Sequence, residues 1–231
     1  MVDWLKIKNQ TDDSASLYFY GDIVSSWWGA WDDEDQYPEN VRKVLDEVKG
    51  KNLNIYINSG GGSVFAGMAI YNMIKRHQGM KTVHVDGLAG SIASIIALAG
   101  DKLIVPSNAY LMIHKPWSGA YGNAKELRKM AEDLDAIEEG IINVYKENLK
   151  DGVDIEVIRE MVQNETWLNG LKASEYFDIE VAEENTAVAC VSECFKDYKN
   201  TPQAFTKQRE VPPSNDEQEK LNKLRMELDL I

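Results

Sequence analysis

The sequence is short of cysteine and of long apolar runs, and each shortage excludes a class of protein. Among its 231 residues the two cysteines, Cys190 and Cys194, are spaced i, i+4 rather than as CxxC, and no histidine lies near them. We therefore expect reduced thiols, no metal site and no cofactor. No apolar stretch reaches the roughly 18 residues that a membrane-spanning helix needs, so a membrane is not expected as a partner.

Basic charge is also scarce. The chain has 25 Lys and Arg residues against 38 Asp and Glu residues, and its net charge of −13 disfavours nucleic acid as a partner. The N-terminal sequence MVDWLKIKNQ lacks the apolar core of a secretory signal, so a cytoplasmic location is expected. A hydrophobic content of 44% indicates a chain that folds around a core.

Strand-like and helix-like segments alternate through the first half of the chain. Apolar residues at helical spacing predict helices over 39–49 and from Val64 to about Gln78. Short apolar runs predict strands over 17–21, 54–58, 82–85, 102–105 and 110–113. This alternation is the pattern of an α/β domain built from βαβ units.

The second half of the chain begins with a long predicted helix over 124–149. Its apolar stripe is longer than a small domain needs to cover itself, so the helix packs either in the core or against another subunit. The stripe consists of Leu127, Met130, Leu134, Ile137, Ile141 and Val144.

The composition changes after about residue 195. Residues 196–218 mix charges with three prolines and read as a linker, and Leu221, Leu224 and Leu228 predict a short amphipathic helix. We therefore expect one domain over 1–194 and an acidic linker with a short C-terminal helix over 195–231.

The segment GLAGSIASIIALAG, residues 87–100, carries two serines three positions apart. Its composition favours a closely packed core helix, approached by a flexible stretch from Gly87 to Gly90. Ser91 falls in the predicted first turn, where unpaired backbone N–H groups favour a developing oxyanion. Ser94, one turn further on, is expected to be a packing residue whose hydroxyl bonds to the helix backbone.

Of the three histidines, His114 is the candidate for chemistry. It follows an apolar strand and precedes Lys115-Pro116, which places its imidazole at a strand tip, where catalytic groups are commonly displayed. His77 lies at a polar helix end and is expected to be solvated, and His84 lies within a strand, where a structural role is expected.

A third segment, Asn58-Ser59-Gly60-Gly61-Gly62, follows a strand and is rich in glycine. It matches neither a Walker A loop nor G-x-G-x-x-G. Two interpretations remain: a plain tight turn, or a loop whose backbone N–H groups face a substrate carbonyl.

Taken together, the three segments resemble the Clp peptidase family of serine proteases over roughly residues 15–185. The resemblance is carried by Ile57-Asn58-Ser59-Gly60-Gly61-Gly62, Gly87-Leu88-Ala89-Gly90-Ser91 and Met112-Ile113-His114-Lys115-Pro116 in that order. It implies a ClpP/crotonase-like α/β fold of repeated ββα units with a long protruding oligomerisation helix, and homo-oligomers of two stacked rings.

The resemblance also implies the site residues by position. Ser91 becomes the nucleophile, His114 the general base, and Glu165 of Asn164-Glu165-Thr166-Trp167-Leu168 the third member of the triad, where the family usually has Asp. The backbone N–H groups of Gly62 and Ile92 become the oxyanion hole, with Gly60 and Gly61 in the substrate-binding loop. Gly60 and Gly90 depart from the family's usual Pro and Ala.

Peripheral features are similar to phage or prophage head maturation proteases of this family. They are Trp27-Trp28, Glu165-Thr166-Trp167 and the acidic linker with its Leu-patterned helix. This branch implies a phage capsid or scaffold protein as the substrate, and the host cytoplasm as the location.

Three other functions remain open. One is a housekeeping ATP-dependent Clp peptidase subunit working with an AAA+ unfoldase. Another is a crotonase-like acyl-CoA enzyme, against which the pair Ser91 and His114 argues. The last is a catalytically silent ring-forming assembly protein.

Overall fold

The computed structural model describes residues 7–8, 10–26, 36–183, 195 and 198–202. The chain divides into two units, Met1–Thr201 and Pro202–Ile231. Trp27, Trp28, both cysteines and the predicted helix around Leu224 lie outside the described residues.

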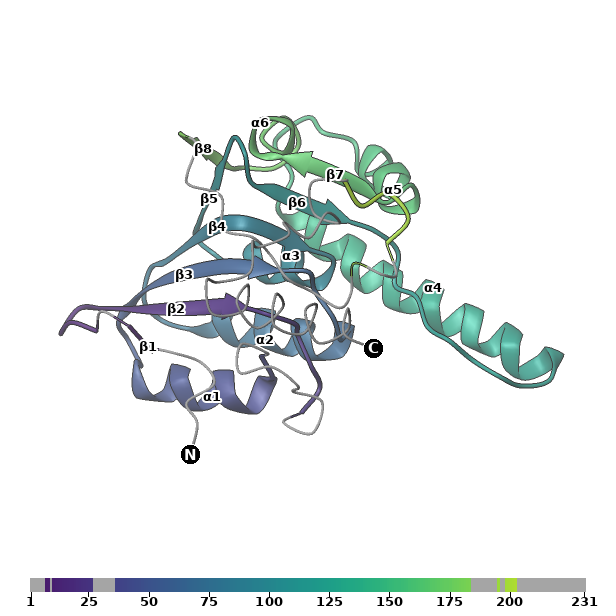
Figure 1. Cartoon of the computed structure of the whole chain (residues 1–231), viewed down its shortest axis with the longest axis horizontal. Helices are drawn as coiled ribbons and strands as arrows, with labels where there is room; N and C mark the ends of the chain where they lie inside the picture. Colours follow the sequence, from purple (N-terminus) through teal and green to yellow (C-terminus); the bar gives the residue numbers. More distant parts are fainter. Residues whose placement is uncertain (1–6, 9, 27–35, 184–194, 196–197, 203–231) are drawn as a thin grey trace, which may run out of the picture. The chain divides into compact units, whose positions relative to one another are not determined.

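The first unit is built on a mixed sheet (Figure 1). Its main path runs β1-β2-β3-β4-β5-β8, in which β2, β3, β4, β5 and β8 are parallel and β1 is antiparallel to β2. A short branch adds β6, parallel to the end of β4, and β7, antiparallel to β6. The strands are β1 (Ile7–Lys8), β2 (Ser14–Tyr20), β3 (Asn52–Ser59), β4 (Lys81–Gly90), β5 (Lys102–Pro106), β6 (Tyr110–Ile113), β7 (Thr166–Asn169) and β8 (Glu180–Ala182).

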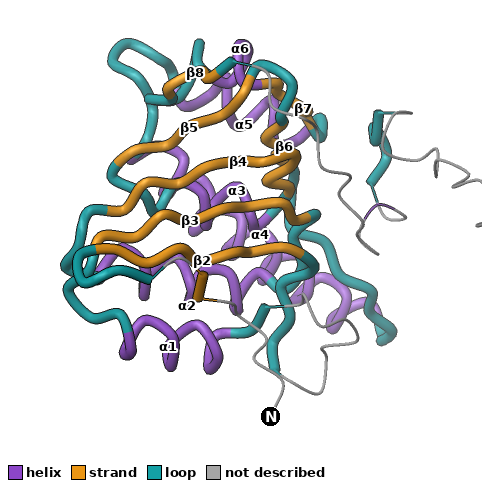
Figure 2. The backbone as a smooth tube through the Cα atoms, turned by 60° about the vertical axis from the view of Figure 1, so that its left-hand side comes forward, coloured by secondary structure: helices purple, strands orange, loops and turns teal. Residues whose placement is uncertain are grey.

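Helices connect the strands, and α2 and α3 lie against one face of the sheet (Figure 2). The helices are α1 (Pro38–Glu47), α2 (Val64–Arg76), α3 (Ile92–Ala97), α4 (Ala124–Glu147), α5 (Ile155–Gln163) and α6 (Gly170–Ala173). The α/β class expected from the sequence is confirmed. So are the five predicted strands and the helices that begin near residues 39, 64 and 124.

The apolar core lies between helices α2 and α3 and the face of the sheet that they cover. Side chains alternate along each strand, so every second residue points into this core. In β2, Leu17 and Phe19 are buried, whereas Tyr18 and Tyr20 are half-buried on the opposite face. The buried apolar set continues through Ile55, Ile57, Ile70, Ile74, Val83, Val85, Ile92, Ile95 and Leu111.

Two histidines have structural partners. The His84 ring stacks on Tyr56 at 4.8 Å, which confirms the expected structural role, and burial lowers the pKa of this imidazole. The sequence predicted a solvated His77, and the structure corrects this. His77 is half-buried, and its Nε2 lies 2.7 Å from the carbonyl oxygen of Lys51. The difference arises because α2 ends against the turn that precedes β3.

The sequence predicted that Gly87 to Gly90 form a flexible approach to a helix, and this prediction is wrong. The stretch continues β4, with Ala89 paired to both Ser59 and Leu111. Small residues are needed here because a Cβ on Gly90 would lie 2.8 Å from the carbonyl oxygen of Gly60. Glycine and alanine have low β-propensity, so the sequence did not predict this part of the strand. Pairing with β3 and β6 stabilises it.

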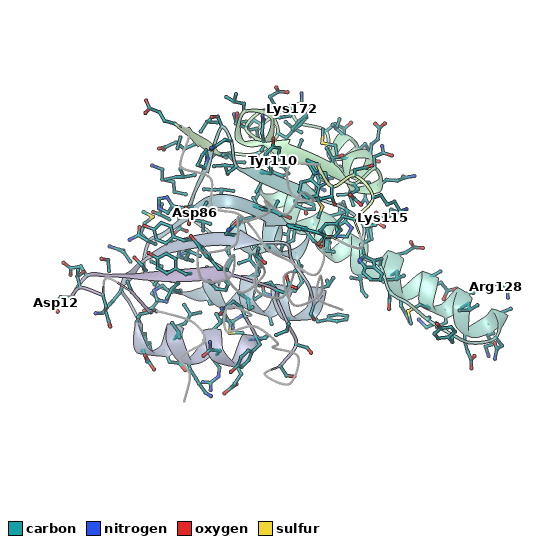
Figure 3. All side chains as sticks on the ribbon, viewed as in Figure 1. Asp12, Asp86, Tyr110, Lys115, Arg128 and Lys172 are labelled. Atoms are coloured by element: carbon teal, nitrogen blue, oxygen red, sulfur yellow. The ribbon has the colours of Figure 1, made fainter. Side chains whose placement is uncertain are left out.

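Helix α4 extends away from the sheet (Figure 1). Asn123 and Glu126 form a capping box at its start, and its buried residues are confined to the last two turns. Figure 3 shows Arg128 near its far end, whereas Lys115, which pairs with Glu138 at 3.0 Å, lies where the helix meets the domain. Between Ala124 and Ala136 the side chains of α4 are exposed, except for the half-buried Met130 and Leu134.

Candidate active site

Ser91 lies at the junction between β4 and α3. It precedes the first residue of α3 and has φ +52° and ψ −125°. Its N–H donates to the carbonyl oxygen of Met112 at 2.7 Å, which fixes this conformation. Ser91 and Glu165 are the two non-glycine residues with positive φ among those that the structure describes. Such strain persists where surrounding structure enforces it, and it concentrates at functional sites.

The sheet brings His114 to Ser91. Gly90 pairs with Met112, so the residues that follow β4 and β6 lie side by side at the same edge of the sheet. The Oγ of Ser91 and the Nε2 of His114 are 2.7 Å apart. Residues 23 positions apart in the sequence thus form the hydrogen bond that a serine nucleophile shares with its base.

Burial sets the protonation of His114. Desolvation lowers the pKa of its imidazole, and the negative charge of Glu165 raises that pKa by a smaller amount. The net shift is downward, so the neutral ring, which is the form able to accept a proton, predominates at neutral pH.

The glycine loop packs directly behind Ser91. Gly61 and Gly62 have φ of +112° and +137°, and a Cβ on Gly61 would lie 2.7 Å from the Cβ of Ser91. Asn58 anchors the loop by accepting the N–H of Leu88 at 3.2 Å. The segment therefore packs closely against Ser91 and the end of β4.

This packing leaves two backbone donors next to the serine. Within the described ranges, the N–H groups of Gly62 and Ile92 have no hydrogen-bond acceptor. The Cβ position of Gly61 lies 3.3 Å from the nitrogen of Ile92, so the loop and the start of α3 meet here. Adjacent unused donors of this kind can stabilise an oxyanion.

Glu165 follows α5 and is buried, with 9% of its surface exposed. Its carboxylate accepts the N–H of Lys199 at 2.7 Å and that of Asn200 at 2.6 Å. Among the described residues it makes no hydrogen bond with His114, which it reaches through its charge. Glu165 is therefore not a solvated carboxylate at the end of α5.

The two serines of the segment 87–100 have different surroundings. Ser94 is buried, and its Oγ donates to the carbonyl oxygen of Ser91 at 2.6 Å. The expected bond to the helix backbone is confirmed, and a second bond, 2.7 Å long, joins Ser94 Oγ to the hydroxyl of Tyr145 on α4.

Tyr198 lies at the site, which no pattern in the sequence predicted. Its hydroxyl donates to the carbonyl oxygen of Gly60 at 2.5 Å, and its ring packs edge-on against His114 with centroids 5.0 Å apart. Residues 196–218 read as a linker because charged residues and prolines surround this one tyrosine. The contact joins residues 138 positions apart, a separation at which hydropathy patterns carry no information.

Over the residues that the structure describes, no group of three or more His, Cys, Asp and Glu side chains is arranged to hold a metal ion. None of the helices in that part of the chain is long and apolar enough to cross a membrane.

Comparison with known proteins gives the family. The sequence model of the Clp protease family matches residues 42–180, which include the glycine loop, Ser91, His114 and Glu165. The chain belongs to the Clp protease family and is a serine-type peptidase.

Its relatives include proteins named ATP-dependent Clp protease proteolytic subunit. The one from Bacteroides fragilis is 29% identical over 149 residues, 62% of this chain and 71% of the relative. That from Ligilactobacillus salivarius is 34% identical over 129 residues, 54% and 64% of the two chains. That from Chlorella vulgaris is 31% identical over 132 residues, 56% and 65%.

Proposed function

We propose that this chain is a serine endopeptidase in which Ser91 is the nucleophile and His114 the general base. The observation that carries the proposal is the 2.7 Å hydrogen bond between Ser91 Oγ and His114 Nε2 beside two unused backbone N–H groups. A serine hydroxyl becomes an effective nucleophile at neutral pH only when a base accepts its proton.

The reaction follows from these positions. Ser91 Oγ attacks the peptide carbonyl carbon as its proton moves to His114 Nε2, and the carbonyl oxygen becomes an oxyanion that accepts the N–H groups of Gly62 and Ile92. His114 then protonates the leaving amine, and the C–N bond breaks to leave an acyl-enzyme. Water, deprotonated by His114, releases the acyl group and regenerates Ser91.

Glu165 takes the place of the third triad member. Its charge raises the pKa of His114, so it stabilises the imidazolium that forms when Ser91 loses its proton. With residues 198–200 in the position that the structure describes, the carboxylate accepts the amides of Lys199 and Asn200. Glutamate, being longer than aspartate, acts here through charge and is oriented by the main chain.

We propose phage capsid or scaffold proteins as the substrates, cleaved during prohead maturation without an ATPase. Support comes from the sequence: Trp27-Trp28, the Glu165-Thr166-Trp167 acid site and the acidic C-terminal segment are similar to that branch of the family. We further propose that the domain over 1–194 assembles into a ring homo-oligomer in the host cytoplasm, through α4.

A second candidate is a housekeeping peptidase subunit that receives unfolded chains from an AAA+ unfoldase. The printed names of the relatives favour it, since they describe proteolytic subunits of an ATP-dependent protease. The two candidates differ in whether cleavage requires ATP and an unfoldase.

A serine-reactive fluorophosphonate probe tests the chemistry. We expect the wild-type protein to be labelled at Ser91, and Ser91→Ala to remain unlabelled at the same oligomer size. Ser94→Ala is the matched control, because it removes a hydroxyl one turn away and should be labelled. Absence of labelling in the wild type, or equal labelling of Ser91→Ala, contradicts the proposal and favours a silent assembly protein.

The substrate is tested separately. Purified protein is incubated with a phage scaffold protein, and with an unfolded protein in the presence or absence of a host AAA+ unfoldase and ATP. Cleavage of the scaffold protein without ATP supports the maturation protease. Degradation that requires the unfoldase and ATP supports the housekeeping subunit.

A further inference from the structure

A small apolar cluster lies apart from the main core, next to Ser91. Leu88 of β4 and Met112 of β6 are fully buried in it, and Tyr110 and Trp167 pack against them. Met112 is also the residue whose carbonyl oxygen accepts the N–H of Ser91. The strands that hold the candidate nucleophile and base therefore also form an apolar wall beside them.

The chain covers this wall with its own Tyr198, which is only 8% exposed. The Tyr198 ring lies edge-on to His114 and to Trp167, at 5.0 and 6.2 Å between centroids, and Phe195 lies 6.4 Å away. Aromatic pairs at these distances attract one another beyond the burial of their area. Removing the ring would therefore leave a pocket whose walls include the proposed general base.

Polar contacts fix the residues on either side. The hydroxyl of Tyr198 donates to the carbonyl oxygen of Gly60, within the loop that holds the proposed oxyanion donor. The next two N–H groups, of Lys199 and Asn200, donate to Glu165, and the Asn200 amide donates to the carbonyl oxygens of Asn164 and Glu165. Three consecutive residues therefore contact the glycine loop, the base and the acid.

A peptide substrate needs the same surfaces. Its carbonyl must lie between Ser91 Oγ and the two free amides, and its neighbouring side chain then lies close to Met112, which is bonded to the Ser91 backbone. Leu88, Met112 and Trp167 offer that side chain an apolar, aromatic surface. Tyr198 and a substrate side chain cannot both occupy this pocket.

We propose that residues 198–200 are a built-in competitor of the substrate, because Tyr198 occupies the apolar surface beside Ser91 that a bound peptide needs. The proposal rests on the proposed function of Ser91 and His114 and adds to it a regulation of that site. The segment lies outside residues 42–180, which the family model matches. Displacing it opens the pocket and frees the Gly60 carbonyl.

The experiment measures the rate of fluorophosphonate labelling of full-length protein. We expect Tyr198→Ala to be labelled about tenfold faster than the wild type, because a competitor that fills the site most of the time lowers the apparent rate by the fraction of open molecules. Tyr198→Phe keeps the ring but loses the bond to Gly60, so it should fall between the two. Tyr18→Ala, on the opposite face of the sheet, is the matched control and should match the wild type.

A chromogenic peptide then tests the competition. Tyr198→Ala should lower the KM for the peptide several-fold with little change in kcat, because the competitor no longer covers the site. A residue that merely positions His114 would change kcat instead.

The outcomes distinguish a failure of the proposed competitor from a failure of the proposed serine chemistry. If the wild type is labelled and Tyr198→Ala is labelled no faster, the competitor is refuted and the serine chemistry stands. If neither protein is labelled, the proposed function fails and the competitor with it. Should Tyr198→Ala fail to fold, judged by circular dichroism, Tyr198→Phe decides: faster labelling than the wild type supports the competitor, and an equal or slower rate overturns it.

Discussion

At the scale of single residues, the surroundings of His114 determine how the site responds to pH. Burial lowers the pKa of its imidazole below the usual value of 6.5, and the charge of Glu165 opposes this shift. Only the neutral ring can accept the proton of Ser91. We therefore expect the labelling rate of Ser91 to rise with pH through an inflection below 6.5 and to be level above it.

Glu165→Gln checks the cause of that inflection. Removing the negative charge removes the contribution that raises the His114 pKa, so the inflection should move further down. The unfolded chain has an ordinary histidine, which binds a proton at higher pH than the folded one. The contribution of His114 to the free energy of unfolding is therefore fully present above about pH 6.5. It is lost as the pH falls through the lowered pKa of His114. An inflection that moves upward in Glu165→Gln contradicts this account.

Ser94 is a second prediction at this scale, and it concerns stability. Its Oγ is bonded to the hydroxyl of Tyr145, which is buried beneath α3 and whose pKa burial raises. Ser94→Ala leaves that hydroxyl without this partner, and we expect a loss of about 1–3 kcal/mol in the free energy of unfolding. Urea denaturation measures it. In the Ser94→Ala/Tyr145→Phe double variant the two losses should not add, because both remove the same bond.

At the scale of elements, the glycine loop shows how little space the site leaves. Gly61→Ala puts a methyl group 2.7 Å from both the carbonyl oxygen of Gly90 and the Cβ of Ser91, so the loop must move. We expect the labelling rate of Ser91 to fall by 10²-fold or more, on the order of the effect of losing one oxyanion donor.

Gly50→Ala is the control for backbone strain. Gly50 also has positive φ, at +81°, but a Cβ there meets nothing within 4 Å. Both substitutions should destabilise the fold by roughly 1–2 kcal/mol through the left-handed backbone. Only Gly61→Ala should slow the labelling, and equal rates in the two variants would show that the position of the loop does not matter.

The sequence predicted the elements better than it predicted their junctions. Buried and half-buried residues alternate in 54–57 and 82–85, a local pattern that made these strands predictable. The strand character of Gly87–Gly90 depends on pairing with β3 and β6, which no local pattern encodes. Ser91 and His114 were candidates because each falls at the end of a predicted element, and the resemblance of the three segments to the Clp peptidase family gave them their expected roles.

The contacts of Glu165 and Tyr198 could not be predicted in this way. Glu165 is buried because the main chain of Lys199 and Asn200 reaches it across 34 and 35 positions. Tyr198 lies among charged residues and prolines with only Phe195 and Phe205 as nearby aromatic residues, and its hydroxyl binds the distant glycine loop. Both depend on a tertiary contact of the C-terminal segment.

At the scale of the whole molecule, the exposed part of α4 bears on the proposed homo-oligomer. Figure 1 shows it extending from the sheet, and its buried residues lie only near its C-terminal end, from Ile141 onwards. Leu127 is 44% exposed, and Trp117 and Tyr121 just before the helix are more exposed still. Apolar side chains gathered on a protruding helix are typical of a surface that a second copy covers.

Leu127→Asp tests this role. A charge placed on the exposed stripe should be left desolvated or repelled in an interface, so we expect sedimentation velocity to show smaller oligomers than the wild type forms. Leu171→Asp is the matched control, because Leu171 is 58% exposed on α6 and the substitution is the same. Both variants should keep the wild-type circular dichroism. If Leu127→Asp assembles as the wild type does, or if Leu171→Asp dissociates equally, the interface does not run along the exposed part of α4.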